Sequence, residues 1–246
     1  MTGCAFTTSW DDGHPLDLKL AALLDRRGFG GTFYIPCRNR EGLPVMPAQD
    51  VRILASRFDI GAHTRDHVYL HAIQPAEART QVADGRKGLE DIIGKRVSGF
   101  AYPGGFHNRT LHAMVAACGF DYARTTENFR TDTGNDRFRV PTTLQLYPHG
   151  PAVYVRNFLK HGSFSLRYDA FAAILAGNTL EKRLRASLDL ALRHGGIFHL
   201  WGHSWELDRI DGWKVLDEFL SYAADRIPPH RRVTNAAALL PLEAAA

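Results

Sequence analysis

The sequence predicts an α/β domain in which about seven parallel strands, each followed by a helix, curl into a closed or nearly closed barrel. Segments rich in β-branched and aromatic residues alternate along the chain with segments whose apolar residues recur at helical spacing. A chain of 246 residues can bury one large core, and a single domain over 1–246 fits this length better than two small ones.

Proline and glycine set the boundaries of the first elements. Residues 4–10 are rich in Thr, Phe and Trp and predict a buried strand. Pro15 can open the next helix, because a helix start leaves its N–H groups unpaired in any case. Leucines at helical spacing continue that helix until Gly28, and the run at 31–36 predicts a second strand that Pro36 stops.

The alternation continues to the end of the chain. Further strands are expected at 59–63, 97–105, 121–126, 138–144 and from 195 onward, and further helices at 48–57, 75–94, 108–118, 179–194 and 212–225. Residues 147–178 give no clear pattern and no prediction. Strands that alternate with helices imply a parallel sheet, with its chemistry at the carboxyl ends of the strands.

The composition excludes several classes of protein. Hydrophobic residues make up 45% and charged residues 23%, as in ordinary globular proteins. The net charge is +4, but no run of Lys and Arg indicates a nucleic-acid partner. Neither a bilayer-spanning apolar run nor a signal-like start is present, so we expect a cytoplasmic protein without a membrane span. Three widely spaced cysteines argue against a disulfide framework and are expected to be buried free thiols, and the oligomeric state stays open.

The stretch TTSWDDGH at 7–14 places two adjacent carboxylates, Asp11 and Asp12, at the end of the first strand. Adjacent side chains at a strand end diverge, so one carboxylate can bind a metal while the other faces a substrate. Gly13 allows a sharp turn behind them. Asp-Gly is also ordinary turn chemistry, so the pair gains its meaning from residues elsewhere.

His63 and His67 are the residues elsewhere in the chain that give the two carboxylates a chemical meaning. They are four apart at the end of the third predicted strand, a spacing that brings two imidazoles to one point if a helical turn follows. One carboxylate from Asp12 and two imidazoles form a three-ligand set with open coordination positions. A hydrolytic zinc site requires such a set.

At these motifs the chain resembles the polysaccharide deacetylases of carbohydrate esterase family 4, which carry the NodB homology domain. TTSWDDGH resembles the first motif of that family, HTRDH at 63–67 the second, FAYPGG at 100–105 the third and LWGH at 200–203 the last. The resemblance implies a distorted (β/α) barrel and one divalent metal ion, usually Zn²⁺. It also implies hydrolysis of an N-acetyl group from an amino-sugar-containing carbohydrate.

The resemblance also implies a role for each matching residue. Asp11 would be the general base, and Asp12, His63 and His67 would be the metal ligands. The backbone N–H of Gly104 would bind the oxyanion, and His203 would protonate the leaving amine. Strand alternation places His199 on the same side as His203, but His203 is expected nearer the rim, and His199 is expected to be a buried neighbour.

Two departures from the family pattern concern the residues around the base and the acid. Ala101 stands where the third motif usually has an arginine beside the base, so another residue must orient Asp11. The fourth motif, which positions the catalytic histidine, is not recognisable. The candidates to replace it are Asp132, Asp136 and Glu206, of which the first two suit exposed loops better.

Aromatic residues beside the motifs suit the flat faces of sugar rings. Trp205, past the strand end, and Tyr102, in the third motif, are the substrate candidates, while Trp201 is expected in the core. The other histidines fit no constellation and are expected to be structural or solvated: His14, His71, His107, His112, His149, His161, His194 and His230.

Three alternatives remain for the function. The same site could cleave another small amide, such as a ureide or a formamide. Two histidines and one carboxylate also form the facial triad of iron(II) oxygenases, although that class expects an all-β fold. A non-catalytic relative that only binds carbohydrate is the third.

Overall fold

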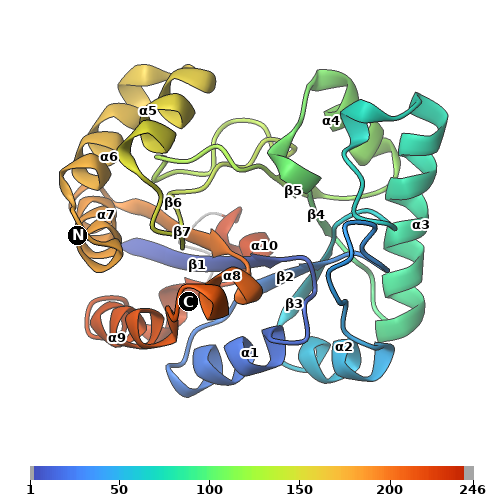
Figure 1. Cartoon of the computed structure of the whole chain (residues 1–246), viewed down its shortest axis with the longest axis horizontal. Helices are drawn as coiled ribbons and strands as arrows, with labels where there is room; N and C mark the ends of the chain where they lie inside the picture. The colour runs from blue at the N-terminus through green and yellow to red at the C-terminus, as the bar shows by residue number, and fades with distance from the viewer. Residues whose placement is uncertain (1–2, 241–246) are drawn as a thin grey trace.

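A computed structural model of the chain describes residues 3–240, and its sheet confirms the predicted (β/α) barrel architecture. The strands are β1 (Cys4–Asp11), β2 (Thr32–Ile35), β3 (Asp59–Ala62), β4 (Gly99–Ala101), β5 (Tyr122–Arg124), β6 (Leu144–Gln145), β7 (Gly196–Gly202) and β8 (Arg232–Val233). They follow the order β5-β4-β3-β2-β1-β7-β6, with β8 paired to β1, and every pair is parallel. The sheet curls, and its concave side lies near the middle of the molecule (Figure 1).

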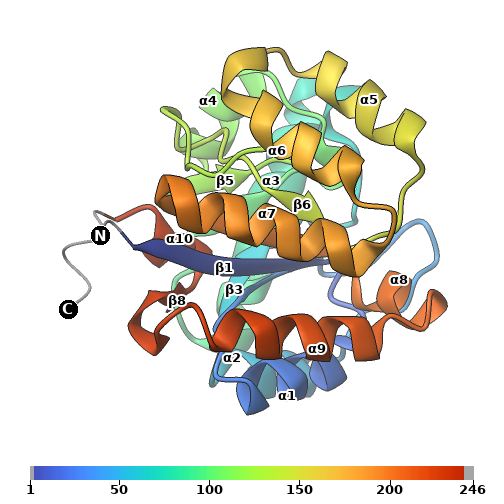
Figure 2. The same ribbon diagram turned by 90° about the vertical axis from the view of Figure 1, so that its left-hand side faces the viewer.

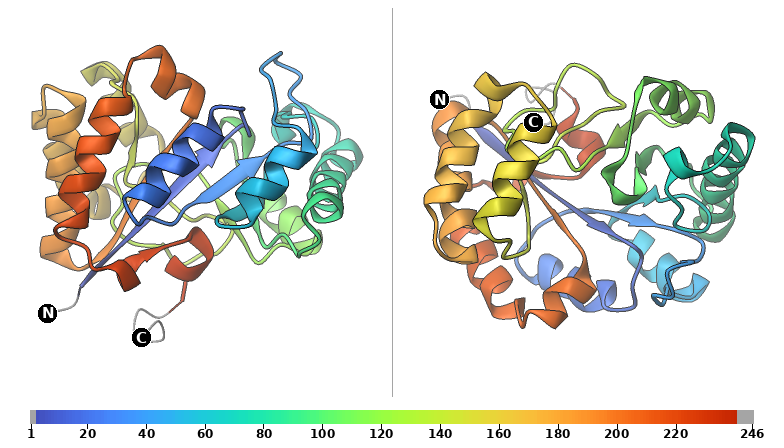
Figure 3. Two further views of the ribbon diagram at one scale, coloured as in Figure 1. Left: turned by 90° about the horizontal axis from the view of Figure 1, so that it is seen from below. Right: turned by 45° about the horizontal axis from the view of Figure 1, so that its top comes forward.

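Helices cover the outside of the curled sheet. They are α1 (Asp17–Arg26), α2 (Ala48–Ala55), α3 (Pro75–Ile93), α4 (Arg109–Ala117), α5 (Pro151–Lys160), α6 (Phe164–Ala176), α7 (Leu180–His194), α8 (Ser204–Arg209), α9 (Trp213–Ala224) and α10 (Asn235–Ala238). Short 3₁₀ helices are η1 (Leu70–Ala72), η2 (Pro103–Gly105) and η3 (Pro229–Arg231). Seen from below, α9, α1 and α2 lie side by side across the sheet (Figure 3, left).

Strand β1 is the centre of the sheet, since it pairs with β2, β7 and β8, and all eight of its residues are buried. Phe6 packs against Phe29, Phe198 and Phe219 with ring centroids 4.7 to 6.1 Å apart. Burial of such side chains is worth about 1.5–3 kcal/mol each, so this cluster anchors β1 below its polar end. The carboxyl end of β1 reaches the side of the molecule where α5 and α8 lie (Figure 2).

The strand predicted at 138–144 is the element that differs most from expectation. Val140 forms a single parallel bridge with Arg124 of β5, and only Leu144–Gln145 forms a strand, which pairs with β7. Pro141 explains the interruption, because proline cannot donate a hydrogen bond to a sheet. The segment therefore crosses from β5 to β7.

Helices α5 and α6 occupy the stretch that gave no prediction. Phe164, Leu166 and Tyr168 of α6 are exposed while Ala170 and Ile174 are buried, so apolar residues surround this helix without forming one stripe. No helix within residues 3–240 has the length and apolarity needed to cross a bilayer. The three cysteines are unpaired, but only Cys4 is fully buried, and Cys37 is exposed, contrary to expectation.

Helix α3 packs directly on the loop that follows β3, and a glycine makes this contact close. A Cβ atom on Gly85 would lie 2.7 Å from the carbonyl carbon of Thr64 and 2.8 Å from the nitrogen of Arg65. Backbone atoms cannot swing away as a flexible side chain can. The loop that carries His63 and His67 is therefore held at a distance only glycine permits.

We predict that Gly85→Ala lowers the free energy of unfolding by about 1–3 kcal/mol, the usual range for overpacking, despite the better helix propensity of alanine. Urea denaturation followed by tryptophan fluorescence measures this. Gly150→Ala is the matched control, because its Cβ would meet no atom within 4 Å, and it should change stability by less than about 0.5 kcal/mol. Equal stability of the two variants would contradict the packing argument.

Candidate metal and catalytic site

The side chains predicted to carry chemistry meet in one cavity at the carboxyl ends of the strands. Its volume is about 360 Å³. Its walls include every residue singled out for a catalytic, ligand or substrate role: Asp11, Asp12, His63, His67, Tyr102, Gly104, His203 and Trp205. Positions far apart in the sequence thus assemble at the edge where parallel α/β sheets usually bind their substrates.

Asp12, His63 and His67 form a compact set of candidate metal ligands. Asp12 follows β1 directly and His63 follows β3 directly. Asp12 Oδ1 lies 3.1 Å from His67 Nε2 and 3.7 Å from His63 Nε2, and one ligand atom from each residue lies within 4.8 Å of the others. A tetrahedral zinc ion holds nitrogen and oxygen ligands about 3.3 Å apart. The spacing therefore suits a single divalent ion.

The hydrogen bonds of this set also fit a metal ion. His63 Nδ1 donates to the carbonyl oxygen of Ala101 at 2.8 Å, which leaves the lone pair of Nε2 directed to the ligand position. Asp12 Oδ1 is buried and has no hydrogen-bond partner within the described part of the chain. A buried carboxylate oxygen without a partner is costly, and a cation bound here would supply one.

The protonation states of the set favour metal binding over proton binding at two of the three ligands. Burial opposes the charged form of Asp12, but the nearby His67, His203 and His63 outweigh it and hold the pKa of that carboxyl well below its usual range. Burial lowers the pKa of His63 to about 4, so its imidazole is neutral. At His67 burial is outweighed by Asp12, which raises the pKa, so protons compete with the metal there at acidic pH.

The backbone around these ligands is strained. Asp12, Thr64 and His67 have φ angles of 77°, 64° and 53°, a region that residues other than glycine rarely adopt. Gln81 of α3 holds the loop by donating to Asp66 Oδ2 at 2.7 Å and accepting from the Asp66 backbone N–H at 3.0 Å. The surrounding structure therefore imposes the conformation that brings the imidazoles to Asp12.

Trp205 contributes to the site through its indole nitrogen. Nε1 donates to Asp12 Oδ2 at 2.9 Å, which orients the carboxylate so that Oδ1 faces His63 and His67. The half-buried ring also lines the cavity. The ring is thus placed where a substrate contact was predicted, and the hydrogen bond gives it a second task that the sequence did not indicate.

Arg124 is the residue that sequence analysis missed beside the predicted base. It forms an ion pair with Asp11 and is fully buried. Arg124 is the register partner of Ala101 on the neighbouring strand, so the arginine absent from position 101 is supplied one strand away. The rings of Tyr34 and Trp201 flank its guanidinium at 5.1 and 5.3 Å. The single arginine in the strand predicted at 121–126 was the available signal.

Glu206 is the partner of His203. Its Oε2 accepts from His203 Nδ1 at 2.6 Å, while His203 Nε2 lies 3.9 Å from Asp12 Oδ2. Of the three carboxylates considered for this position, Asp132 pairs with Arg130 and Asp136 with His112 instead. Burial opposes protonation of His203, but Glu206 and Asp12 outweigh it and raise the pKa of this imidazole to about 9.

The third motif lines the cavity in two different ways. Tyr102 is buried, and its hydroxyl donates to the carbonyl oxygen of Phe138 at 3.0 Å. The hydroxyl is thus engaged, and the residue can meet a substrate only as part of the wall. Gly104 is exposed with φ at 64°, and a Cβ there would lie 2.9 Å from Tyr69 and 3.0 Å from Phe106. Gly104 thus lies in the cavity wall, where its backbone N–H was predicted to bind the oxyanion.

Together, the fold and the site define a (β/α) barrel protein whose cavity holds two histidines and one carboxylate as candidate metal ligands, with Asp11 and His203 beside them. A sequence model described as polysaccharide deacetylase matches residues 5–123. That part of the chain is therefore similar to the polysaccharide deacetylases, which confirms the resemblance of the motifs at 7–14, 63–67 and 100–105. A search of curated protein sequences found no match.

Solved structures of low sequence identity share the fold over most of the chain. A putative polysaccharide deacetylase from Mycobacterium smegmatis is 17% identical with a TM-score of 0.61, covering 90% of this chain and 85% of the other. The chitin deacetylase of Colletotrichum lindemuthianum is 14% identical, also with a TM-score of 0.61, covering 97% and 90%. A family 4 carbohydrate esterase from Streptomyces lividans is 13% identical with a TM-score of 0.55, covering 90% of each chain.

We predict that Arg124→Leu lowers the free energy of unfolding by about 3–5 kcal/mol, because it leaves the Asp11 carboxylate buried without its cation. Arg96→Leu is the control, since it breaks an ion pair with Asp121 whose side chains are 55% and 48% exposed, and it should cost at most about 1 kcal/mol. Urea denaturation of both variants measures the difference. Similar losses would show that the Asp11–Arg124 pair is not a structural determinant.

Proposed function

We propose that this protein is a metal-dependent hydrolase that removes an N-acetyl or other N-acyl group from an amino-sugar-containing carbohydrate. The observation that carries the proposal is the single cavity that holds a metal-ligand set, a carboxylate and a histidine with a raised pKa. The match of residues 5–123 to a sequence model described as polysaccharide deacetylase supports the same chemistry.

The metal would be held by Asp12, His63 and His67, with zinc the best fit to two imidazoles and one carboxylate. When bound, such an ion polarises an amide carbonyl and lowers the pKa of water to about 7. Trp205 keeps Asp12 in its ligand orientation through the 2.9 Å hydrogen bond to Oδ2.

Asp11 is the proposed general base. Its carboxylate accepts a proton from the attacking water, and the ion pair with Arg124 fixes its position. The backbone N–H of Gly104 is the proposed donor to the oxygen that gains negative charge. Asp11 Oδ1 pairs with Arg124, whereas Asp12 Oδ1 lies close to the two imidazoles, and this difference in partners separates the proposed roles of Asp11 and Asp12.

His203 is the proposed general acid. Its pKa of about 9 keeps the imidazole protonated at neutral pH, and Glu206 holds Nδ1 so that Nε2 faces the cavity. His199 is buried instead, contacts Ser9 Oγ at 2.8 Å and does not line this cavity. Burial lowers the pKa of His199 to about 3, so it holds no extra proton to deliver.

The mouth of the cavity suits a sugar. Tyr69 and Phe106 are 38% and 40% exposed, and their rings are 5.8 Å apart. Exposed aromatic faces beside polar groups are typical of sites that bind carbohydrate rings. The oxygenase alternative expects an all-β fold, which the α/β barrel contradicts. The presence of Asp11 and His203 in one cavity argues against a relative that only binds sugar.

We predict that chelated protein resupplied with Zn²⁺ releases acetate from N-acetylated amino-sugar oligosaccharides, and that Asp11→Asn lowers turnover by about 10²-fold or more at unchanged metal content. Acetate and formate are measured over a panel of N-acetyl and N-formyl sugars, a ureide and a formamide. Asp25→Asn, at an exposed carboxylate, is the control. Formate or ureide cleavage without acetate release would replace the deacetylase proposal with the other amide hydrolase.

We predict an alkaline limb at which turnover falls as pH rises through the pKa of His203, which Glu206 raises, because the acid form of His203 is present below its pKa and lost above it. Glu206→Gln removes the charge that stabilises the imidazolium, so the alkaline limb should move to lower pH. His199→Ala should leave that limb in place and lower stability instead. If His199→Ala abolishes the limb in single-turnover rates while His203→Ala keeps it, the two roles are reversed.

A further inference from the structure

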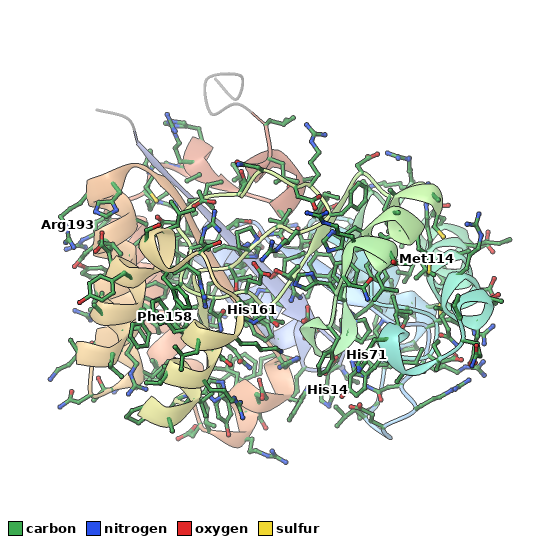
Figure 4. The ribbon with its side chains drawn as sticks, turned by 90° about the horizontal axis from the view of Figure 1, so that it is seen from above. His14, His71, Met114, Phe158, His161 and Arg193 are labelled. Atoms are coloured by element: carbon green, nitrogen blue, oxygen red, sulfur yellow. The ribbon has the colours of Figure 1, made fainter. Side chains whose placement is uncertain are left out.

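A second cluster of metal-ligating side chains lies beside the cavity. His107 follows η2, Glu127 follows β5, and His161 directly follows α5. Seen from above, His161 lies near the middle of the molecule, between α5 and α6 on one side and α3 and α4 on the other (Figure 4). One ligand atom from each residue lies within 4.8 Å of the others. The sequence gave no reason to group these three residues.

The geometry of this cluster repeats that of the Asp12 set. Glu127 Oε1 lies 3.2 Å from His107 Nε2 and 3.6 Å from His161 Nδ1. The corresponding separations around Asp12 Oδ1 are 3.1 and 3.7 Å. Both pairs bracket the separation of about 3.3 Å between ligands of tetrahedral zinc. The second cluster therefore has the spacing and the donor types of a metal site.

The cluster is shielded from water, and two of its side chains are in the protonation states that bind metals. The side chains of His107, Glu127 and His161 are 10%, 6% and 11% exposed. Burial opposes ionisation of Glu127, but His107 and Arg139 outweigh it and lower the pKa of the carboxyl to about 2. Burial lowers the pKa of His161 to about 4. At neutral pH the cluster thus presents a carboxylate and a neutral imidazole, which are the forms that bind metals.

The contacts of His107 and His112 require more protons than two neutral imidazoles carry. His107 Nδ1 contacts His112 Nε2 at 3.0 Å, and His112 Nδ1 contacts Asp136 Oδ2 at 3.1 Å. The row from Asp136 to Glu127 therefore has three contacts, each of which needs one proton, but two neutral imidazoles carry only two. Burial lowers the pKa of His112, which disfavours an extra proton there. An added proton in this row, or a metal ion at the contact between His107 and Glu127, would complete it.

Arg139 is the competing partner of Glu127. Its Nε donates to Glu127 Oε1 at 2.8 Å, yet its side chain is 43% exposed and can move toward water. A carboxylate has about four lone-pair positions on two oxygens, so it can accept from a guanidinium and bind a metal at once. Arg139 therefore weakens a metal site without abolishing it.

We propose that His107, Glu127 and His161 bind a second divalent metal ion, of the kind that takes imidazole and carboxylate ligands, such as zinc. His107 contacts His112 through its other ring nitrogen, and His112 in turn contacts Asp136. Metal-bound histidines usually have such a hydrogen-bond partner behind the ring. His161 also lines the cavity. An ion bound by these residues would therefore lie beside the cavity that is proposed to bind the carbohydrate.

The test is metal stoichiometry of the full chain, measured by elemental analysis and by titration of chelated protein with Zn²⁺ and Co²⁺. Wild-type protein should bind two equivalents. His161→Ala and Glu127→Gln should each bind one, His63→Ala should also bind one, and the His63→Ala, His161→Ala double variant should bind none. His71→Ala, at an exposed histidine outside both clusters, should still bind two. Arg139→Ala should bind the second ion more tightly than wild-type protein.

One outcome overturns this proposal without touching the proposed function. If wild-type protein binds one equivalent that His63→Ala removes and His161→Ala leaves in place, the second cluster is a network of ion pairs and hydrogen bonds without a metal ion. Circular dichroism of each variant separates loss of a site from loss of folding, and His161→Gln offers a second, smaller change at the same position. Acetate release is measured separately, so failure of the deacetylase proposal would appear there alone.

Discussion

The constraint on which the site depends is the burial of two adjacent carboxylates. Asp11 and Asp12 are both 3% exposed, and two neighbouring negative charges in a protein interior are unstable unless each has its own compensation. Arg124 supplies that compensation for Asp11. Asp12 receives one hydrogen bond from Trp205, while its Oδ1 lacks one within residues 3–240 and lies close to two imidazoles. The arrangement that supports the proposed cation at Asp12 thus follows from how the first strand ends.

The elements that depend on local sequence could be predicted, and those that depend on distant partners could not. Helices α1, α3 and α7 show their spacing and boundaries in the sequence, as does the strand β1. The segment at 138–145 has the composition of one strand, but it pairs first with β5 and then with β7 on either side of Pro141. Helix α6 gave no signal, because a helix with apolar residues on all sides has no stripe to detect.

The same distinction applies to the site. Asp11, Asp12, His63 and His67 were found because strand ends of a parallel sheet meet at one edge. Arg124 was missed because its register with Ala101 is a relation between strands. The row His112–His107–Glu127 was missed for the same reason, since side chains from three segments meet there. Glu206 was found among alternatives, but only the fold shows that it, rather than Asp132 or Asp136, contacts His203.

His199 and His203 show how depth in the barrel controls chemistry on a single strand. Alternation places both on one side of β7, and neither residue type nor direction separates them. His199 lies inside the sheet next to Thr7, where Ser9 and the carbonyl oxygen of Pro141 are its contacts. Burial disfavours the protonated imidazole of His199, and no nearby carboxylate stabilises that form, so the pKa of His199 falls to about 3. His203 lies past the strand end, where Glu206 and Asp12 stabilise the protonated imidazole. Their effect exceeds that of burial and raises the pKa of His203 to about 9. The charged groups at this end of the barrel therefore determine which of the two imidazoles on β7 is protonated at neutral pH.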